Sequence, residues 1–219
     1  MSSEIEAIVS DYVASKPIGS LIVKYLVYLK KMQLFNPKVI YDIGSSLGKF
    51  AEAAKLVFPD AEIYLFDACP SFEPYYQNNK YFITCLSDED DKEVKFYDTN
   101  TINDPRVKSY YKSKYSTDEY KVCKTSKLDS FIKANNLPPP DLVKISCGGS
   151  EMDIINGGLD TLKNSKYVMV QLQNEEIYEG APLAHRVGPY IESFNFERKD
   201  TLDSYGIALI DYVFENKNI

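Results

Sequence analysis

The sequence predicts a single α/β domain built on a doubly wound, mostly parallel sheet of about seven strands. Its length of 219 residues suits one domain. Strand-like and helix-like segments alternate through the middle of the chain, which is the pattern of a parallel sheet wrapped by helices. A glycine-rich turn lies between the first buried strand and the helix that follows it. We therefore expect one domain over 1–219, with an N-terminal helical extension at 1–35 and an α/β core at 36–219.

Two helices are expected before the core, at 3–15 and 19–33, because Pro17 and Gly19 interrupt the helical pattern between them. Apolar residues recur at helical spacing in the second helix and form a stripe of Leu21, Ile22, Tyr25, Leu26 and Leu29. A stripe of this size is too large to leave in water. We expect it to pack beside the ligand pocket or to form a subunit contact in a homodimer.

The core begins with a β-branched, mostly apolar run at 38–43, which is typical of a buried parallel strand and stops at Gly44. A helix at 50–57 follows. Strands are expected next at 61–66 and 81–86, and short alternating segments at 93–97 and 120–124 flank an irregular stretch. The second half is expected to hold, in order, a strand at 142–146, a helix at 150–162, a strand at 167–172, a helix at 182–194 and a strand pair at 196–199 and 206–214.

Charge and cysteine content exclude several classes of protein. The net charge of −7, from 32 acidic and 25 basic residues, disfavours a nucleic acid or an anionic membrane as partner. No apolar run approaches the ~20 residues of a membrane span, and the acidic N-terminus lacks the basic start of a signal peptide. We therefore expect a cytoplasmic protein. The cysteines form no C-x-x-C pair, so we expect buried reduced thiols and no zinc site at Cys69, Cys85, Cys123 and Cys147.

The turn after the first strand reads D-x-G-x-x-x-G, with Asp42, Gly44 and Gly48 in the fixed positions. Glycines there let the backbone approach a ligand closely. The spacing differs from the G-x-G-x-x-G turn that cradles a dinucleotide pyrophosphate. This spacing suits S-adenosylmethionine as the ligand, because S-adenosylmethionine has no phosphate. Asp42 is placed to meet the amino-acid end of that ligand. Asp67 ends the second strand 25 residues later, where an acid can accept hydrogen bonds from both ribose hydroxyls. The alternatives are a glycine turn without a ligand and a solvated acid at a strand end.

At this point the chain resembles the FkbM family of methyltransferases over about three quarters of its length. The matching text is VIYDIGSSLGKFAEAAKLVFPDAEIYLFDACP, CLSDEDDKEVKFY, SKLDSFI, PDLVKISCGGSEMDIINGG and VMVQLQNEEIYEGAP. The resemblance implies class I methyltransferase topology, S-adenosylmethionine as donor, and mainly O-methylation of sugars, glycans or polyketide-like products. By position, it assigns Asp42, Gly44, Ser45 and Gly48 to the methionine part of the cofactor, Asp67 to its ribose, and Ala68, Cys69, Leu86 and Ser87 to its adenine.

The chain departs from the family pattern K-I-D-V-E/Q-G-x-E at the next strand-to-helix turn. Ser146 stands for the usual Asp and Gly148 for the usual Glu or Gln, and Gln171 replaces a later Glu. The missing side chain at Gly148 would leave an opening for a bulky ring. Active sites of open α/β sheets lie at the carboxyl ends of the strands, so the candidate catalytic residues here are Lys144, Ser146, Glu151 and Gln171. The alternatives are a surface or packing lysine at 144 and a first-turn helix acid at 151.

A sugar hydroxyl is a weak nucleophile while protonated, so it needs a general base or a metal ion. Ser146 and Gln171 lack the charge that Mg²⁺ or Mn²⁺ prefers in its ligands, and a metal site is therefore not favoured. His185, the only histidine, is the first candidate base and Glu151 the second. The alternative for His185 is an exposed helical residue. The irregular stretch at 98–120 is either disordered or a sugar-stacking lid, whose rings would be Tyr110, Tyr111, Tyr115 and Tyr120.

The sequence therefore predicts an S-adenosylmethionine-dependent O-methyltransferase that acts on a hydroxyl of a sugar or glycan. Two alternatives stay open. One is methylation of a non-sugar hydroxyl or a carboxylate. The other is a protein that keeps the cofactor pocket, has lost its chemistry at 146, 148 and 171, and serves as a partner or scaffold.

Overall fold

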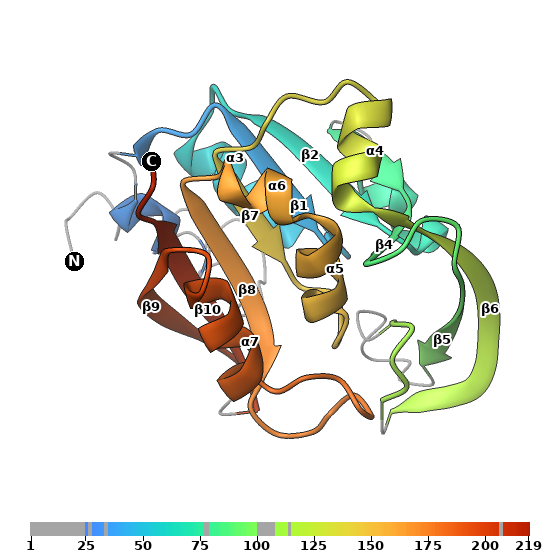
Figure 1. Cartoon of the computed structure of the whole chain (residues 1–219). Coiled ribbons are helices and arrows are strands. Elements are labelled where there is room, and N and C mark those ends of the chain that lie inside the picture. Colours follow the sequence, from blue (N-terminus) through green and yellow to red (C-terminus); the bar gives the residue numbers. More distant parts are fainter. Residues whose placement is uncertain are drawn as a thin grey trace, which may run out of the picture.

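A computed structural model of the chain (Figure 1) describes residues 25, 28–32, 35–76, 79–99, 108–113, 115–205 and 208–219. The expected helix at 3–15 lies outside the described residues, as does much of the expected helix at 19–33.

Seven strands of the described chain form the main sheet, in the order β3-β2-β1-β7-β8-β10-β9. Their bounds are β1 Val39–Ile43, β2 Glu62–Asp67, β3 Lys80–Ile83, β7 Leu142–Ile145, β8 Tyr167–Gln173, β9 Phe196–Tyr205 and β10 Leu209–Asn216. The strands from β3 to β8 pair in parallel, whereas β10 runs antiparallel to both β8 and β9. This confirms the predicted doubly wound, mostly parallel sheet. The strand order reverses between β1 and β7, so a ligand crevice is expected at their carboxyl ends.

Helices cover both faces of the main sheet (Figure 1). Helix α3, Lys49–Val57, packs on one face, and α5 Glu151–Gly157, α6 Leu159–Lys163 and α7 Ala184–Glu192 pack on the other. Side chains alternate along each strand, so Ile40 belongs to the core under α3 and Tyr41 to the opposite core. Tyr25, Tyr28 and Leu29 of the N-terminal extension are buried in the core under α3.

A second, smaller sheet has the strand order β4-β6-β5. Its strands are β4 Cys85–Ser87, β5 Glu93–Thr99 and β6 Ser116–Lys127. The antiparallel pair of β5 and β6, called the ribbon below, lies at the right-hand edge of Figure 1, beyond α5. The predicted pairing of 93–97 with 120–124 is therefore confirmed. Two further short helices are the 3₁₀ helix η2, Pro70–Tyr75, between β2 and β3 of the main sheet, and α4, Leu128–Ala134, which leads from β6 back to β7.

Several element bounds differ from those predicted. The single strand expected at 81–86 is two strands in different sheets, because the chain turns at Thr84, whose amide bonds to the Asp67 carbonyl at 2.8 Å. The helix expected at 150–162 breaks at Gly158, where an added Cβ would lie 2.7 Å from Leu128 Cδ2. Strand β6 begins at Ser116, so part of the stretch expected to be irregular is regular strand.

The four cysteines are free thiols, with Cys69 and Cys85 buried and Cys123 and Cys147 half-buried. Burial as predicted is thus confirmed for two of the four. Within the described part of the chain, no helix is long and apolar enough to cross a membrane.

Candidate active site

A cavity of about 470 Å³ opens at the carboxyl ends of β1, β2, β7 and β8. This volume is within the range of ordinary ligand pockets, about 300–1,000 Å³. Nine of the fourteen candidate cofactor and catalytic residues line it, namely Asp42, Gly44, Ser45, Asp67, Ala68, Leu86, Lys144, Ser146 and Gln171. The crevice expected from the strand order is therefore the cavity that these residues share.

Five other candidates do not line the cavity: Gly48, Cys69, Ser87, Glu151 and His185. Gly48 caps α3 with a φ of 69°, a left-handed conformation that favours glycine. The backbone amide of Cys69 donates to Asp67 Oδ1 at 2.8 Å. Ser87 is buried just behind the cavity, with its hydroxyl 3.3 Å from the Tyr110 hydroxyl. These three residues shape the site without facing it.

Asp67 is fixed at the end of β2 by backbone amides. Ser46 donates to Oδ2 and Cys69 to Oδ1, each at 2.8 Å. The Tyr76 hydroxyl lies 3.4 Å from Oδ2 and donates to the Ser46 carbonyl at 2.6 Å. Burial raises the pKa of Asp67, and the amide hydrogen bonds oppose this rise. Each carboxylate oxygen keeps lone-pair capacity for a further donor. Sequence reasoning missed Tyr76, whose contacts depend on the turn after η2.

Asp42 is buried at the end of β1 and is 2% exposed. Among the described residues its Oδ2 has no hydrogen-bond partner. Burial raises the pKa of Asp42 to about 7, although the nearby Lys144 cation lowers it. A buried carboxylate oxygen without a donor is costly unless a ligand supplies one.

Gly44 brings the ends of β1 and β7 together. Its φ is 76°, and an added Cβ would lie 2.1 Å from the Ser146 carbonyl oxygen. Only glycine fits this crossing, so the first glycine of the sequence motif serves strand packing as well as ligand access.

Lys144 lies on the floor of the cavity and is 2% exposed, which rules out the surface-lysine interpretation. Its Nζ lies 3.5 Å from Asp211 Oδ1, and Tyr25 donates to Asp211 Oδ2 at 3.4 Å. Sequence reasoning missed Asp211 as a site residue. The available signal was an acid in the middle of the apolar strand β10.

Two uncharged polar side chains stand at the β7–β8 side of the cavity. The Ser146 hydroxyl donates to Gln171 Oε1 at 3.0 Å. These two positions, where the family usually has carboxylates, therefore hold a hydrogen-bonded pair that the sequence did not predict.

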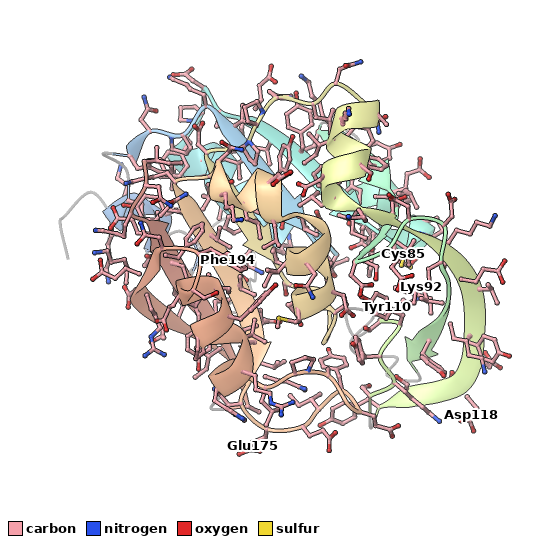
Figure 2. All side chains as sticks on the ribbon, viewed as in Figure 1. Cys85, Lys92, Tyr110, Asp118, Glu175 and Phe194 are labelled. Carbon is pink, nitrogen blue, oxygen red and sulfur yellow. The ribbon has the colours of Figure 1, made fainter. Side chains whose placement is uncertain are left out.

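Residues 108–113, called the strap below, close one side of the cavity. The strap is attached to the ribbon by the Tyr97 amide, which donates to the Ser109 carbonyl at 2.7 Å. The Ser109 hydroxyl donates to the Gly148 carbonyl at 2.6 Å. Tyr110 and Tyr111 both donate to Asp153 Oδ2 of α5, at 2.8 and 2.9 Å. Figure 2 shows Tyr110 between α5 and the ribbon, near Cys85.

Of the four tyrosines expected to form a sugar-stacking lid, Tyr110 and Tyr115 line the cavity, whereas Tyr111 and Tyr120 do not. Tyr120 is on β6, where its ring packs against Tyr97 and lies under the Lys95 ammonium. The cavity wall gains Tyr178 instead, from the loop between β8 and α7. Sequence reasoning missed Tyr178.

The space left by Gly148 is filled by the protein itself. An added Cβ at Gly148 would lie 3.1 Å from Ser109 Cβ and 3.2 Å from the Tyr178 ring. The opening predicted for a bulky ring is thus occupied by Tyr178 and the strap. These residues pack into the space that the usual Glu or Gln side chain at position 148 would take.

The two candidate bases lie away from the cavity. Glu151 is buried, and its Oε1 accepts from the Cys147 amide at 2.7 Å, which stabilises the turn before α5. Burial raises the pKa of Glu151 to about 7, against the amide hydrogen bonds. His185 is exposed on α7, as in the alternative interpretation of that residue. In the described chain, no group of three or more His, Cys, Asp and Glu side chains gathers as a metal site.

Two solved structures share the fold. Methanococcus jannaschii fibrillarin is similar with a TM-score of 0.50 at 10% identity, over 83% of this chain and 67% of that one. A Burkholderia thailandensis 1,6-didemethyltoxoflavin-N1-methyltransferase, with S-adenosylhomocysteine bound, is similar with a TM-score of 0.50 at 11% identity, over 99% and 91%. These likenesses show the class I, Rossmann-like methyltransferase fold.

A curated relative gives a closer sequence match. The 2-O-methyltransferase NoeI of Sinorhizobium fredii is 25% identical over 161 residues, which cover 65% of this chain and 66% of NoeI. Residues 42–198 match the methyltransferase FkbM domain. That range includes both acids of the cavity, the Ser146–Gln171 pair and the strap. The chain therefore belongs to the FkbM family of methyltransferases.

Proposed function

We propose that this protein methylates a hydroxyl oxygen of a sugar or glycan. The main observation that supports this proposal is the composition of the cavity wall apart from Asp42 and Asp67. There the wall includes the uncharged Ser146–Gln171 pair and the rings of Tyr110, Tyr115 and Tyr178, beside the lysines Lys49, Lys108 and Lys144. Aromatic faces and uncharged hydrogen-bonding groups are well suited to a neutral polyhydroxyl ring. The name of the relative NoeI, a 2-O-methyltransferase, supports transfer to oxygen.

The residues present fit S-adenosylmethionine. Asp42 Oδ2 is buried without a partner among the described residues, and would accept a hydrogen bond from the ammonium of the cofactor's amino-acid end. Asp67 would accept from the ribose hydroxyls with its remaining lone pairs. Leu86, Ala68 and Ile154 give the same end of the cavity apolar walls that suit adenine.

S-adenosylmethionine, when bound, would supply an electrophilic methyl group; the acceptor oxygen would take it in place of the hydroxyl proton, which would pass to solvent water, and S-adenosylhomocysteine would be left. The chain's own contribution is alignment. Ser146 Oγ can accept from the acceptor hydroxyl while Gln171 orients the neighbouring hydroxyl, and alignment of this kind supplies much of an enzyme's rate. The described carboxylates of the wall, Asp42 and Asp67, are on β1 and β2, the strands assigned to the cofactor. Glu151 does not line the cavity and accepts from the Cys147 amide in the turn before α5.

An activity screen tests this proposal. Methyl transfer from labelled S-adenosylmethionine is measured across nucleotide sugars, oligosaccharides, phenols and carboxylic acids, with EDTA or with Mn²⁺. We expect transfer to a sugar hydroxyl that persists in EDTA. Ser146→Ala and Gln171→Ala should each lower kcat/KM about tenfold or more, because each removes a hydrogen bond that aligns the acceptor. His185→Ala, an exposed residue on α7, is the matched control and should leave kcat/KM near that of the wild type.

Each other outcome identifies an alternative. Preference for a phenol or a carboxylic acid would favour a non-sugar acceptor. Cofactor binding without methylation of any acceptor would favour the partner or scaffold role. Activity that EDTA abolishes and Mn²⁺ restores would show a metal-dependent reaction.

A further inference from the structure

Three buried charged side chains lie in a row that begins with Asp42 and Lys144 at the cavity and ends with Asp211 behind it. Asp42 on β1 and Lys144 on β7 are direct neighbours in the sheet register. Lys144 is in register with Met169 and Met169 with Val213, so Asp211, two residues before Val213, lies on the same face of the sheet. Asp42 and Lys144 are 2% exposed and Asp211 is 0% exposed.

The outer end of this row is closed by the N-terminal extension. Lys144 Nζ lies 3.5 Å from Asp211 Oδ1 and 5.7 Å from the centroid of the Tyr25 ring. The Tyr25 hydroxyl donates to Asp211 Oδ2 at 3.4 Å, and its ring packs edge-on against Phe50 of α3. Lys144 is thus held between two carboxylates in a site shielded from water, where charges interact strongly.

Asp42 is the member of the row that reaches the cofactor end. Its Oδ2 has no hydrogen-bond partner in the described chain. The groups that face it are Lys144 from β7, Asp67 from β2, and the Ser45 side chain and Ala51 amide beyond β1. The Tyr76 hydroxyl also lies within electrostatic reach of Asp42.

We propose that Lys144 and Asp211 are positioning residues that set the charge state of Asp42, and that they thereby make cofactor binding depend on pH in the neutral range. This inference rests on the proposed function, because it assumes that Asp42 meets the ammonium of S-adenosylmethionine. It assigns Lys144 and Asp211 a role in binding that acts through Asp42 without contact to the acceptor.

The direction of each effect follows from the charges. Ionised Asp42 attracts an ammonium, so affinity is constant above the pKa of Asp42 in the free protein, about 7, and falls below it. The fall approaches tenfold per pH unit, because binding must then release a proton. Lys144 lowers the pKa of Asp42, and Asp211 partly offsets the Lys144 cation. Removing Lys144 should therefore raise the pH at which affinity begins to fall, and removing the Asp211 charge should lower it.

Calorimetric titration with S-adenosylhomocysteine, between about pH 5.5 and about pH 8.5, tests these shifts. The ligand carries the same amino-acid end and undergoes no reaction, so binding is measured without turnover. The midpoint, defined as the pH at which the affinity has fallen to half its high-pH value, should lie near pH 7 in the wild type. Lys144→Met should move the midpoint up, and Asp211→Asn should move it down, each by about half a unit or more. If the ion pair between Lys144 and Asp211 were only structural, its two single variants would destabilise the protein but would not shift the midpoint in opposite directions.

Two controls separate Asp42 from other groups. Asp42→Asn should bind weakly at every pH, without the neutral-range fall. Glu151→Gln addresses the other buried acid with a pKa raised to about 7, and should keep the wild-type midpoint. A midpoint that disappears with Glu151→Gln would overturn the assignment to Asp42.

A double variant keeps the test decisive if a single variant does not fold, since removing one partner of a buried pair leaves an uncompensated charge. Lys144→Met/Asp211→Asn removes both charges, and its midpoint should lie above that of the wild type because Lys144 is the nearer of the two. A double variant with the wild-type midpoint, or single variants that shift in the same direction, would overturn the inference. A folded wild type that binds no S-adenosylhomocysteine at any pH would instead overturn the cofactor assignment of the proposed function.

Discussion

At Gly148 the backbone takes a φ of 61° against the strap and the Tyr178 ring. We expect Gly148→Ala to lower the free energy of unfolding by about 1–3 kcal/mol, because the new methyl group presses on Ser109 and Tyr178 in addition to straining the backbone. Gly180→Ala is the matched control, since Gly180 has a similar φ of 72° with no atom within 4 Å of an added Cβ. Urea denaturation measures both losses. Equal losses would mean that the strap does not press on position 148.

Residue by residue, the sequence predicted what local spacing encodes. Asp42 and Asp67 were found because a glycine turn and a strand end mark them, and both line the cavity. Asp211 and Tyr25 were not found as partners, because their hydrogen bond joins residues 186 positions apart. Glu151 follows a recognisable motif, yet its carboxylate faces the Cys147 amide, which only the folded turn reveals.

Among the elements, the strap depends on one carboxylate of α5. Asp153 accepts hydrogen bonds from both Tyr110 and Tyr111, so Asp153→Ala should leave two half-buried hydroxyls without this acceptor. We expect faster amide hydrogen exchange in residues 108–113, and an acceptor KM raised about tenfold, with the fold intact. Asp153→Asn keeps an acceptor oxygen and should give a smaller change. Unchanged exchange in Asp153→Ala would show that the other attachments of the strap, to the ribbon and to Gly148, are enough to hold it.

Element order followed from hydrophobic periodicity, and several element ends did not. The run at 81–86 has one apolar pattern, but the chain leaves the main sheet at Thr84 to pair with β6, a partner about 40 residues further on. The break between α5 and α6 occurs where Leu128 of α4 crosses Gly158. The change of sheet at Thr84 and the helix break at Gly158 both depend on tertiary contacts. The hydrophobic periodicity within each segment therefore does not predict them.

For the whole molecule, stability should depend on pH through two buried acids. The pKa values of Asp42 and Glu151 rise from 3.8 and 4.5 to about 7 on folding, mainly through burial. The folded protein thus holds more protons than the unfolded chain between these limits. The stabilisation from protonated Asp42 and Glu151 is complete below about pH 4 and is lost as the pH rises to about 7.

Glu151→Gln tests this dependence because glutamine cannot ionise. Relative to the wild type, its free energy of unfolding without ligand should rise by about 1 kcal/mol or more between pH 5 and pH 8, as measured in urea. The exposed Glu192→Gln on α7 serves as the control and should show no such change. A Glu151→Gln variant that follows the wild-type pH curve would contradict the raised pKa.

The position of β10 has a consequence for the synthesis of the chain. This strand follows the other six strands of the main sheet in sequence, yet it inserts between β8 and β9 and brings Asp211 to the buried Lys144. While the ribosome is still adding β10, Asp42 is the only carboxylate present in the row of Lys144. Tyr25 also lacks its hydrogen-bond acceptor Asp211, which follows it by 186 residues. A nascent chain therefore contains every glycine and acid of the cofactor motif before it contains Asp211, the partner of the buried Lys144. The ability to hold the proposed methyl donor should arise abruptly, when β10 leaves the exit tunnel and enters the sheet.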